Sequence, residues 1–112
     1  MLSEQEQAAI LLEAGFGVPG PAFFANKDQF TISKEAYKKY FAASNLIEKN
    51  KKEHREFPNR DGHHIIERKR SGKFELLLME RGQVYFELEF KNKEELISYL
   101  VNEMFTQLGL PG

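Results

Sequence analysis

Apolar and polar residues alternate along three successive segments of the chain, at residues 63–70, 73–79 and 83–90. Alternation with a period of two is typical of β-strands that bury one face. The dipeptides Ser71-Gly72 and Arg81-Gly82 separate these segments and are typical of hairpin turns. The pattern therefore predicts a three-stranded antiparallel meander.

After the third segment the apolar spacing changes to three and four residues, over residues 93–107, which predicts an amphipathic helix. Asn92 and Glu95 form its N-terminal cap, and Gly109 lies just past its end. We expect this closing helix to cover the apolar face of the meander. The expected members of that face are Ile65, Phe74, Leu76, Leu78, Val84, Phe86, Leu88 and Phe90.

The length of each loop decides which side chains lie opposite one another. In the first hairpin we predict a two-residue Ser71-Gly72 turn with Arg68 opposite Glu75, because a three-residue turn pairs like charges. In the second hairpin we predict a three-residue loop over residues 80–82. A two-residue loop would place Leu76 opposite Glu87 and divide the apolar set.

The N-terminal part predicts two helices. Ser3 and Glu6 form a capping box that begins the first, Gly15 should end it, and Ser33 caps the second. Residues 16–25 contain two prolines, which disfavour regular helix and central strand alike, and residues 30–32 are compatible with a short extra edge strand. The apolar side chains of the proline-containing segment must be buried or form a contact; they are Phe16, Val18, Phe23 and Phe24.

These elements predict one α+β domain over residues 1–112, in which the C-terminal helix packs on the meander and two helices precede it. The chain is 41% hydrophobic and 29% charged, a balance that suits one packed core. It contains no cysteine, which excludes disulfides and thiolate chemistry. The first residues lack a basic targeting region and no apolar run is long enough to span a membrane, so we expect a cytoplasmic protein.

Charge is distributed unevenly along the chain. Residues 49–73 hold nine Lys or Arg and four acids, so the segment carries +5 within a chain of net charge −1. An acidic protein partner fits this segment. A small regulatory protein that uses the segment to bind nucleic acid is the alternative hypothesis, although such a domain is usually basic overall and offers an aromatic platform.

Three histidines are the only candidates for a metal site. His63 and His64 are adjacent, with His54 and Asp61 nearby in sequence. Neighbouring strand residues point to opposite faces of a sheet, so His63 and His64 cannot readily share one ion. We therefore expect no metal, no cofactor and no catalytic residue in this chain.

The outer face of the meander carries the strongest candidate for function. An apolar row framed by charges is how many protein interfaces are built. Either the N-terminal helices cover this face or it binds a partner, and Arg68, Tyr85 and Glu87 should remain at the rim in both cases. The candidate partner-binding residues are His64, Ile66, Arg68, Leu77, Tyr85 and Glu87.

The meander HHIIERKRSGKFELLLMERGQVYFELEF and the closing helix NKEELISYLVNEMFTQLGL resemble, in architecture and size, the small immunity proteins of bacterial polymorphic toxin systems. The resemblance covers residues 60–110. It implies a cytoplasmic, non-enzymatic inhibitor that binds one cognate toxin domain and neutralises it. No individual functional residue is carried over by the resemblance.

Overall fold

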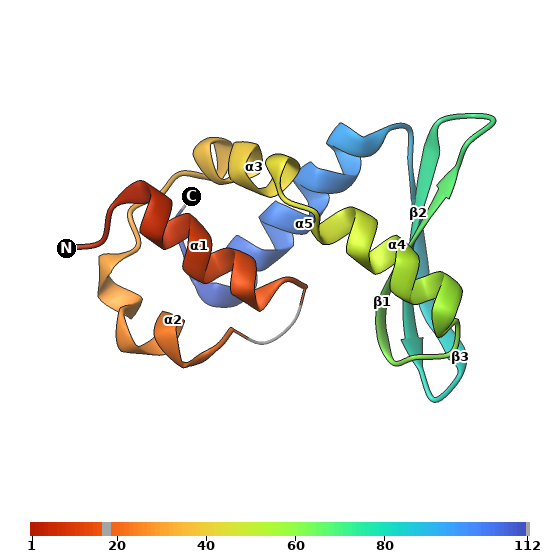
Figure 1. The fold of residues 1–112 in the computed structure, drawn as a ribbon, viewed down its shortest axis with the longest axis horizontal. Coiled ribbons are helices and arrows are strands. Elements are labelled where there is room, and N and C mark those ends of the chain that lie inside the picture. Colours follow the sequence, from red (N-terminus) through yellow and green to blue (C-terminus); the bar gives the residue numbers. More distant parts are fainter. Residues whose placement is uncertain (17–18, 112) are drawn as a thin grey trace. The chain divides into compact units, whose positions relative to one another are not determined.

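A computed structural model describes residues 1–16 and 19–111 and confirms the α+β class (Figure 1). Its sheet has three antiparallel strands in the order β1-β2-β3, as predicted. A helix closes the chain, and the described residues before the sheet form more helices than the two expected. The elements are α1 (Glu4–Ala14), α2 (Pro21–Ala25), the 3₁₀ turn η1 (Lys27–Gln29), α3 (Lys34–Ala43), α4 (Leu46–Glu56), β1 (Gly62–Arg68), β2 (Lys73–Glu80), β3 (Gln83–Phe90) and α5 (Lys93–Leu108).

The described residues form two compact units. A helical unit combines residues 1–44 with the chain from Ile97 onward, and a sheet unit comprises Asn45–Leu96. The helical unit contains α1, α2, α3 and most of α5, whereas the sheet unit contains α4 and the three strands. The expectation of one domain stays a prediction, and each unit is described by itself below.

The caps predicted in the helical unit are present. The Ser3 hydroxyl accepts a hydrogen bond from the Glu6 backbone N–H, and the Glu6 carboxylate accepts one from the Ser3 N–H. Gly15 ends α1 with a positive φ of 58°, which glycine adopts at little cost. Ser33 accepts a hydrogen bond from Ala36 and so caps α3. These three helix ends were therefore predicted correctly, because each depends on residues close together in the sequence.

Residues 30–32 do not form the extra edge strand with which their sequence is compatible, and the side chain of Gln7 binds their backbone instead. This side chain is buried, and its Oε1 accepts the backbone N–H groups of Thr31 and Ile32, each at 2.8 Å. The segment is extended but is not a strand. One side-chain amide satisfies the backbone groups that a neighbouring strand would otherwise bind, so the sequence pattern indicated the conformation and missed its partner.

Aromatic side chains fill the core of the helical unit. The Tyr37 ring lies 6.1 Å from Phe41 on the same helix and 5.9 Å from Phe105 on α5, measured between centroids. Apolar residues of α5 therefore form part of the core of the helical unit, since Val101 and Phe105 are fully buried. The Tyr37 hydroxyl is also buried and has no hydrogen-bond partner among the described residues.

The described part of the proline-containing segment from residue 19 onward contains a short helix, which the two prolines were expected to disfavour. Pro21 begins the short helix α2, where a missing backbone N–H costs nothing. Phe23 is buried against Phe30, with ring centroids 4.9 Å apart, whereas Phe24 is 61% exposed. Val18 lies outside the described residues.

The second predicted helix is two helices. Ser44 is extended, with ψ of 170°, and its hydroxyl donates to the Phe41 carbonyl. This competition between a serine side chain and the helical backbone ends α3 at Ala43. Ile47 lies beyond this break and is buried on α4.

Within the sheet unit, α4 is the helix that packs against the strands, and it lies along β1 (Figure 1). The closing helix lies mostly in the helical unit, so the expectation that it covers the apolar face of the meander stays a prediction. Ile65, Phe74 and Leu76 are buried, but Val84 and Phe86 on β3 are 51% and 37% exposed. An amphipathic pattern shows that a helix buries one face without identifying what covers it.

Asn50 on α4 binds the outer edge of β1. Its Nδ2 donates to the His63 carbonyl at 2.9 Å, and its Oδ1 accepts the Ile65 N–H at 2.8 Å. The amide thus occupies the place of a peptide group in a neighbouring strand. This contact satisfies backbone groups that would otherwise be open to another chain.

The first hairpin has a longer loop than predicted. Arg68 pairs with Lys73, so residues 69–72 form the loop and Ile66 lies opposite Glu75. The two-residue turn is wrong, but the shift is by an even number, so every side chain stays on its predicted face. Arg68 still binds Glu75, diagonally, with Nε to Oε2 at 2.9 Å and Nη2 to Oε1 at 3.1 Å.

Replacement of Asn50 tests the importance of the β1 edge. In Asn50→Ala the buried Ile65 N–H loses its partner, whereas the His63 carbonyl keeps the bond from Arg60 Nη2. We expect the free energy of unfolding to fall by about 1–3 kcal/mol. Urea unfolding measures the change, and the exposed neighbour Lys49→Ala serves as a control that should be near neutral. Equal stabilities of the two variants would contradict this role.

For Tyr37, by contrast, we predict that removal of a buried polar group increases stability. Tyr37→Phe removes a buried polar atom that has no partner among the described residues and keeps the ring contacts with Phe41 and Phe105. We expect the variant to be more stable by about 1 kcal/mol, seen as a higher thermal midpoint. A clear loss of stability would show that the hydroxyl has a partner after all.

Candidate functional site

Strand β3 forms the open edge of the sheet and pairs only with β2. Its residues are exposed from Gln83 to Glu87, and Leu88 and Phe90 are half-buried. Val84, Tyr85 and Phe86 are 51%, 73% and 37% exposed. Three successive large side chains open to solvent on an edge strand are unusual, because such edges invite pairing with other chains. We call Val84, Tyr85, Phe86, Glu87 and Glu89 the β3 surface.

A β-bulge positions these side chains. Leu78 pairs with Phe86, but Met79 pairs with Val84, so β3 carries one extra residue, Tyr85, at this point. A bulge bends its strand and redirects the side chain beside it. Tyr85 is accordingly the most exposed apolar member of the β3 surface.

The three-residue loop predicted for the second hairpin is wrong because the prediction did not include this β-bulge. The loop has two residues, Arg81 and Gly82, with φ of 53° and 77°. Positive φ at both positions is what a type I′ turn requires. The prediction rejected this loop because it would place Leu76 opposite Glu87. The bulge restores the apolar match by bringing Leu76 opposite Leu88, but it moves Val84 from its predicted face to the other one, opposite Met79.

An acidic residue from outside the hairpin supports this turn. Arginine at a positive φ is strained relative to glycine. The Asp61 carboxylate, just before β1, accepts the Arg81 backbone N–H at 2.9 Å. Asp61 was considered only as a metal ligand in the sequence, so this contact was missed.

The predicted partner-binding residues separate into three groups. Arg68, Tyr85 and Glu87, expected at the rim, are exposed. Ile66 and Leu77 are half-buried. His64 is fully buried, so it is corrected from a surface residue to an internal one.

His64 is held on both ring nitrogens. Its Nε2 binds the Arg60 carbonyl, and its Nδ1 lies 2.8 Å from Nδ1 of His54 on α4. A carbonyl only accepts, so Nε2 of His64 carries the hydrogen; in the neutral pair His54 must then donate from Nδ1. The pair joins α4 to β1. Sequence reasoning treated the histidines as possible ligands and missed their direct contact.

Burial lowers the pKa of His54 and of His63. For His54, desolvation is the largest cause, followed by the positive charge of His64 when protonated and by nearby arginines. For His63, desolvation is again the largest cause, followed by Arg60. Both rings are therefore held in the neutral form more strongly in the folded chain than in the unfolded one.

Much of the basic segment is internally neutralised. Lys51 binds both Glu48 and Glu67, and its hydrogen bond lowers the pKa of Glu67. Such pairing reduces the positive charge that a phosphate backbone would meet. Within the described part of the chain, the paired basic residues of this segment are Lys51, Lys52, Arg60, Arg68 and Lys73.

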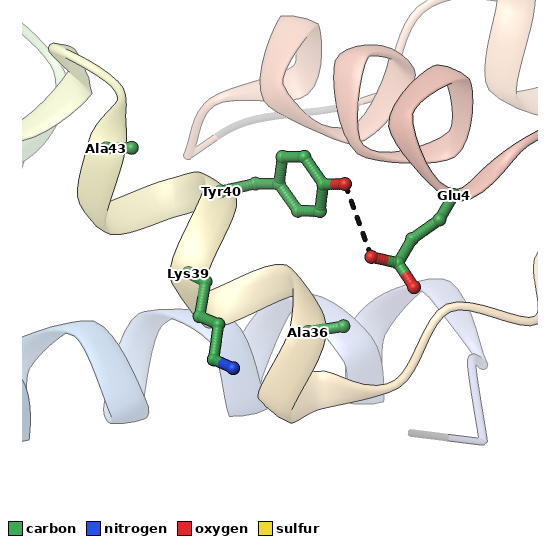
Figure 2. Close-up of a pocket in the computed structure, with 5 residues that line it drawn as sticks. All are labelled: Glu4, Ala36, Lys39, Tyr40 and Ala43. Atoms are coloured by element: carbon green, nitrogen blue, oxygen red, sulfur yellow. Dashed lines mark hydrogen bonds between the residues drawn. The ribbon is translucent and has the colours of Figure 1, made fainter.

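A separate groove lies in the helical unit, between α1 and α3 (Figure 2). It has a volume of about 550 Å³, and Figure 2 shows Tyr40 pointing across it to Glu4, whose carboxylate accepts the phenol hydrogen bond at 3.2 Å. Partial desolvation and this bond raise the pKa of Tyr40. Ala36, Lys39 and Ala43 complete the lining. The groove offers one hydroxyl and one carboxylate that already satisfy each other.

A metal centre and a membrane span are the remaining site classes. Among residues 1–16 and 19–111, no group of three or more His, Asp or Glu side chains is arranged to hold a metal ion. In that same part of the chain, no helix combines the length and apolar composition needed to cross a bilayer.

Comparison with protein-family models, with curated proteins and with solved structures finds no match to this chain. The β3 surface is therefore interpreted from its own geometry.

The lowered histidine pKa values predict an acid-sensitive fold. The unfolded chain takes up protons near the ordinary value of 6.5, whereas folded His54 and His63 take them up only at lower pH. The free energy of unfolding should therefore be highest above pH 6.5 and fall as the pH drops from there towards the folded values. The slope is at most about 1.4 kcal/mol per pH unit for each histidine.

Urea unfolding between about pH 7.5 and about pH 5 checks this dependence. Because Glu67 has its pKa lowered from 4.5, it acts below this window. His63→Gln should flatten the slope. An unchanged slope in that variant would show that His63 does not contribute.

Proposed function

We propose that this chain is a protein-binding module that recognises one partner protein through the β3 surface and catalyses no reaction. The observation that carries the proposal is the run of exposed apolar side chains at Val84, Tyr85 and Phe86 on an open strand. A solvent-exposed Tyr bordered by apolar and charged groups is typical of the centre of a protein interface.

The surrounding charges favour a specific contact over general stickiness. Glu87 follows Tyr85 by two residues on β3 and forms no ion pair with any residue that the structure describes, whereas Glu89 binds Lys73 at 3.3 Å. Between β1 and β2, Arg68 and Glu75 form a two-point ion pair. Charges around an apolar centre select among partners and increase the association rate more than they increase affinity.

The class of partner comes from the resemblance of the meander and closing helix to toxin-neutralising immunity proteins. We propose that the partner is the toxic domain of a polymorphic toxin and that the complex forms in the cytoplasm, where it blocks the toxin. The natural candidate is a toxin encoded beside this chain.

The decisive experiment is to mix the purified chain with the toxic domain of a toxin encoded next to it, and to co-express the two. A complex of fixed stoichiometry in size-exclusion chromatography, together with rescue of growth, is the expected result. Failure to bind and to protect against any neighbouring toxin would remove the proposal.

Tyr85→Ser should weaken this complex by roughly tenfold or more, because an aromatic side chain at the centre of an interface contributes strongly to binding. Phe57→Ser is the matched control, since Phe57 is 60% exposed, similar to Tyr85 at 73%, and lies outside β3. Isothermal titration calorimetry measures both affinities. Equal losses in the two variants would show that the β3 surface is not the interface.

A further inference from the structure

The two edges of the sheet differ in how their backbone groups are satisfied. At β1, the side-chain amide of Asn50 binds two of the outward-facing groups, the His63 carbonyl and the Ile65 N–H, and α4 lies alongside. At β3, no described element pairs with the outer edge. Long, open edges that lack proline and lysine are templates for another strand, and β3 has neither residue over its length.

The backbone groups that β3 presents can be identified from the registers. The two groups bound by Asn50 point away from β2, and strand backbone groups alternate in direction from residue to residue. When this alternation is followed through both hairpins, the groups of Leu88 face β2. Those of Glu87 and Glu89 therefore face outward, on the side that has no described strand.

We propose that an extended segment of the partner, with basic residues at alternate positions, adds to the outer edge of β3 as a fourth strand. This proposal rests on the proposed function and specifies how the partner is recognised. The Glu87 and Glu89 backbone groups supply the hydrogen bonds, and the side chains of the β3 surface supply the specificity.

The charges of β3 determine the chemistry of the added strand. Directly opposed residues on paired strands share one face, so the partner residues opposite Glu87 and Glu89 meet two carboxylates. Lysine or arginine opposite Glu87 forms an ion pair with a carboxylate that no described residue pairs, whereas opposite Glu89 it shares the carboxylate with Lys73. The intervening positions lie beside Phe86 and Leu88, where apolar side chains fit.

A second copy of this chain is a poorer occupant. β3 holds two acids and no basic residue, so two β3 strands paired around Glu87 and Glu89 bring like charges together on one face. A basic segment of another protein removes this repulsion, and self-pairing therefore becomes an outcome of the test rather than the proposal.

The test distinguishes the contribution of the Glu87 backbone N–H from that of the Glu87 side chain. Glu87→Pro removes the outward N–H and the carboxylate, and proline is tolerated on an edge strand whose N–H faces solvent. Glu87→Ala removes the carboxylate alone. The folded state of each variant is verified by hydrogen exchange, because the Phe86 and Leu88 amides should stay protected by β2.

The probe is a short blocked peptide of alternating lysine and valine, with an alternating glutamate and valine peptide as its control. In the wild-type chain the basic peptide should protect the Glu87 and Glu89 amides from exchange, and added salt should weaken its binding. Glu87→Ala should bind a few-fold more weakly, and Glu87→Pro roughly tenfold more weakly than Glu87→Ala. The acidic peptide should give no protection.

Three results would overturn the proposal. They are the absence of protection at saturating basic peptide, equal affinities of the proline and alanine variants, and protection that depends on the concentration of this chain alone and accompanies a dimer in sedimentation.

The same variants distinguish this proposal from the proposed function. If the neighbouring toxin binds and Tyr85→Ser weakens it, but Glu87→Pro binds as Glu87→Ala does, the function stands and the added strand is wrong. If no toxin binds while the basic peptide protects the edge, the added strand stands and the toxin-neutralising function is wrong.

Discussion

The constraint on which the sheet unit depends is that every strand edge must satisfy its backbone groups or leave them open to another chain. The Asn50 side-chain amide, with α4 alongside, solves part of this problem for β1, at the His63 carbonyl and the Ile65 N–H. No described element solves it for β3, and the most exposed apolar side chains of the strands gather there. The functional interpretation follows from this asymmetry, because it separates an edge that the fold closes from one that it leaves accessible.

The sequence predicted the features that local chemistry determines. Period-two alternation located three strands, and the hydroxyls of Ser3 and Ser33 marked two helix starts. Contacts between residues far apart in the chain could not be predicted from the sequence. Gln7 binds a segment more than twenty positions away, and nothing in the sequence distinguishes such an amide from an exposed glutamine. The partners of an amphipathic helix are equally non-local, which is why the pattern did not identify α4 as the helix that lies along β1.

The candidate site was predicted in part. Alternation placed Glu87 correctly on the outer face, where it lies opposite Leu77 of β2. Tyr85 is exposed as expected, but the bulge rather than parity directs its side chain. Alternation also assigned His64 to the outer face, and the ring is nevertheless buried against His54 from another element. The bulge at Tyr85 escaped prediction because an inserted residue has no signature in a pattern that assumes strict alternation.

The bond between Asp61 and Arg81 has a consequence for how the meander assembles. The tight turn that sets the register of the last hairpin needs an arginine in an unfavourable conformation, and the carboxylate that stabilises it lies at the start of the first strand. The final hairpin therefore gains its full stability only when the first strand is docked. The three strands are coupled in this way into one cooperative element, so the open edge is displayed only by a completed sheet.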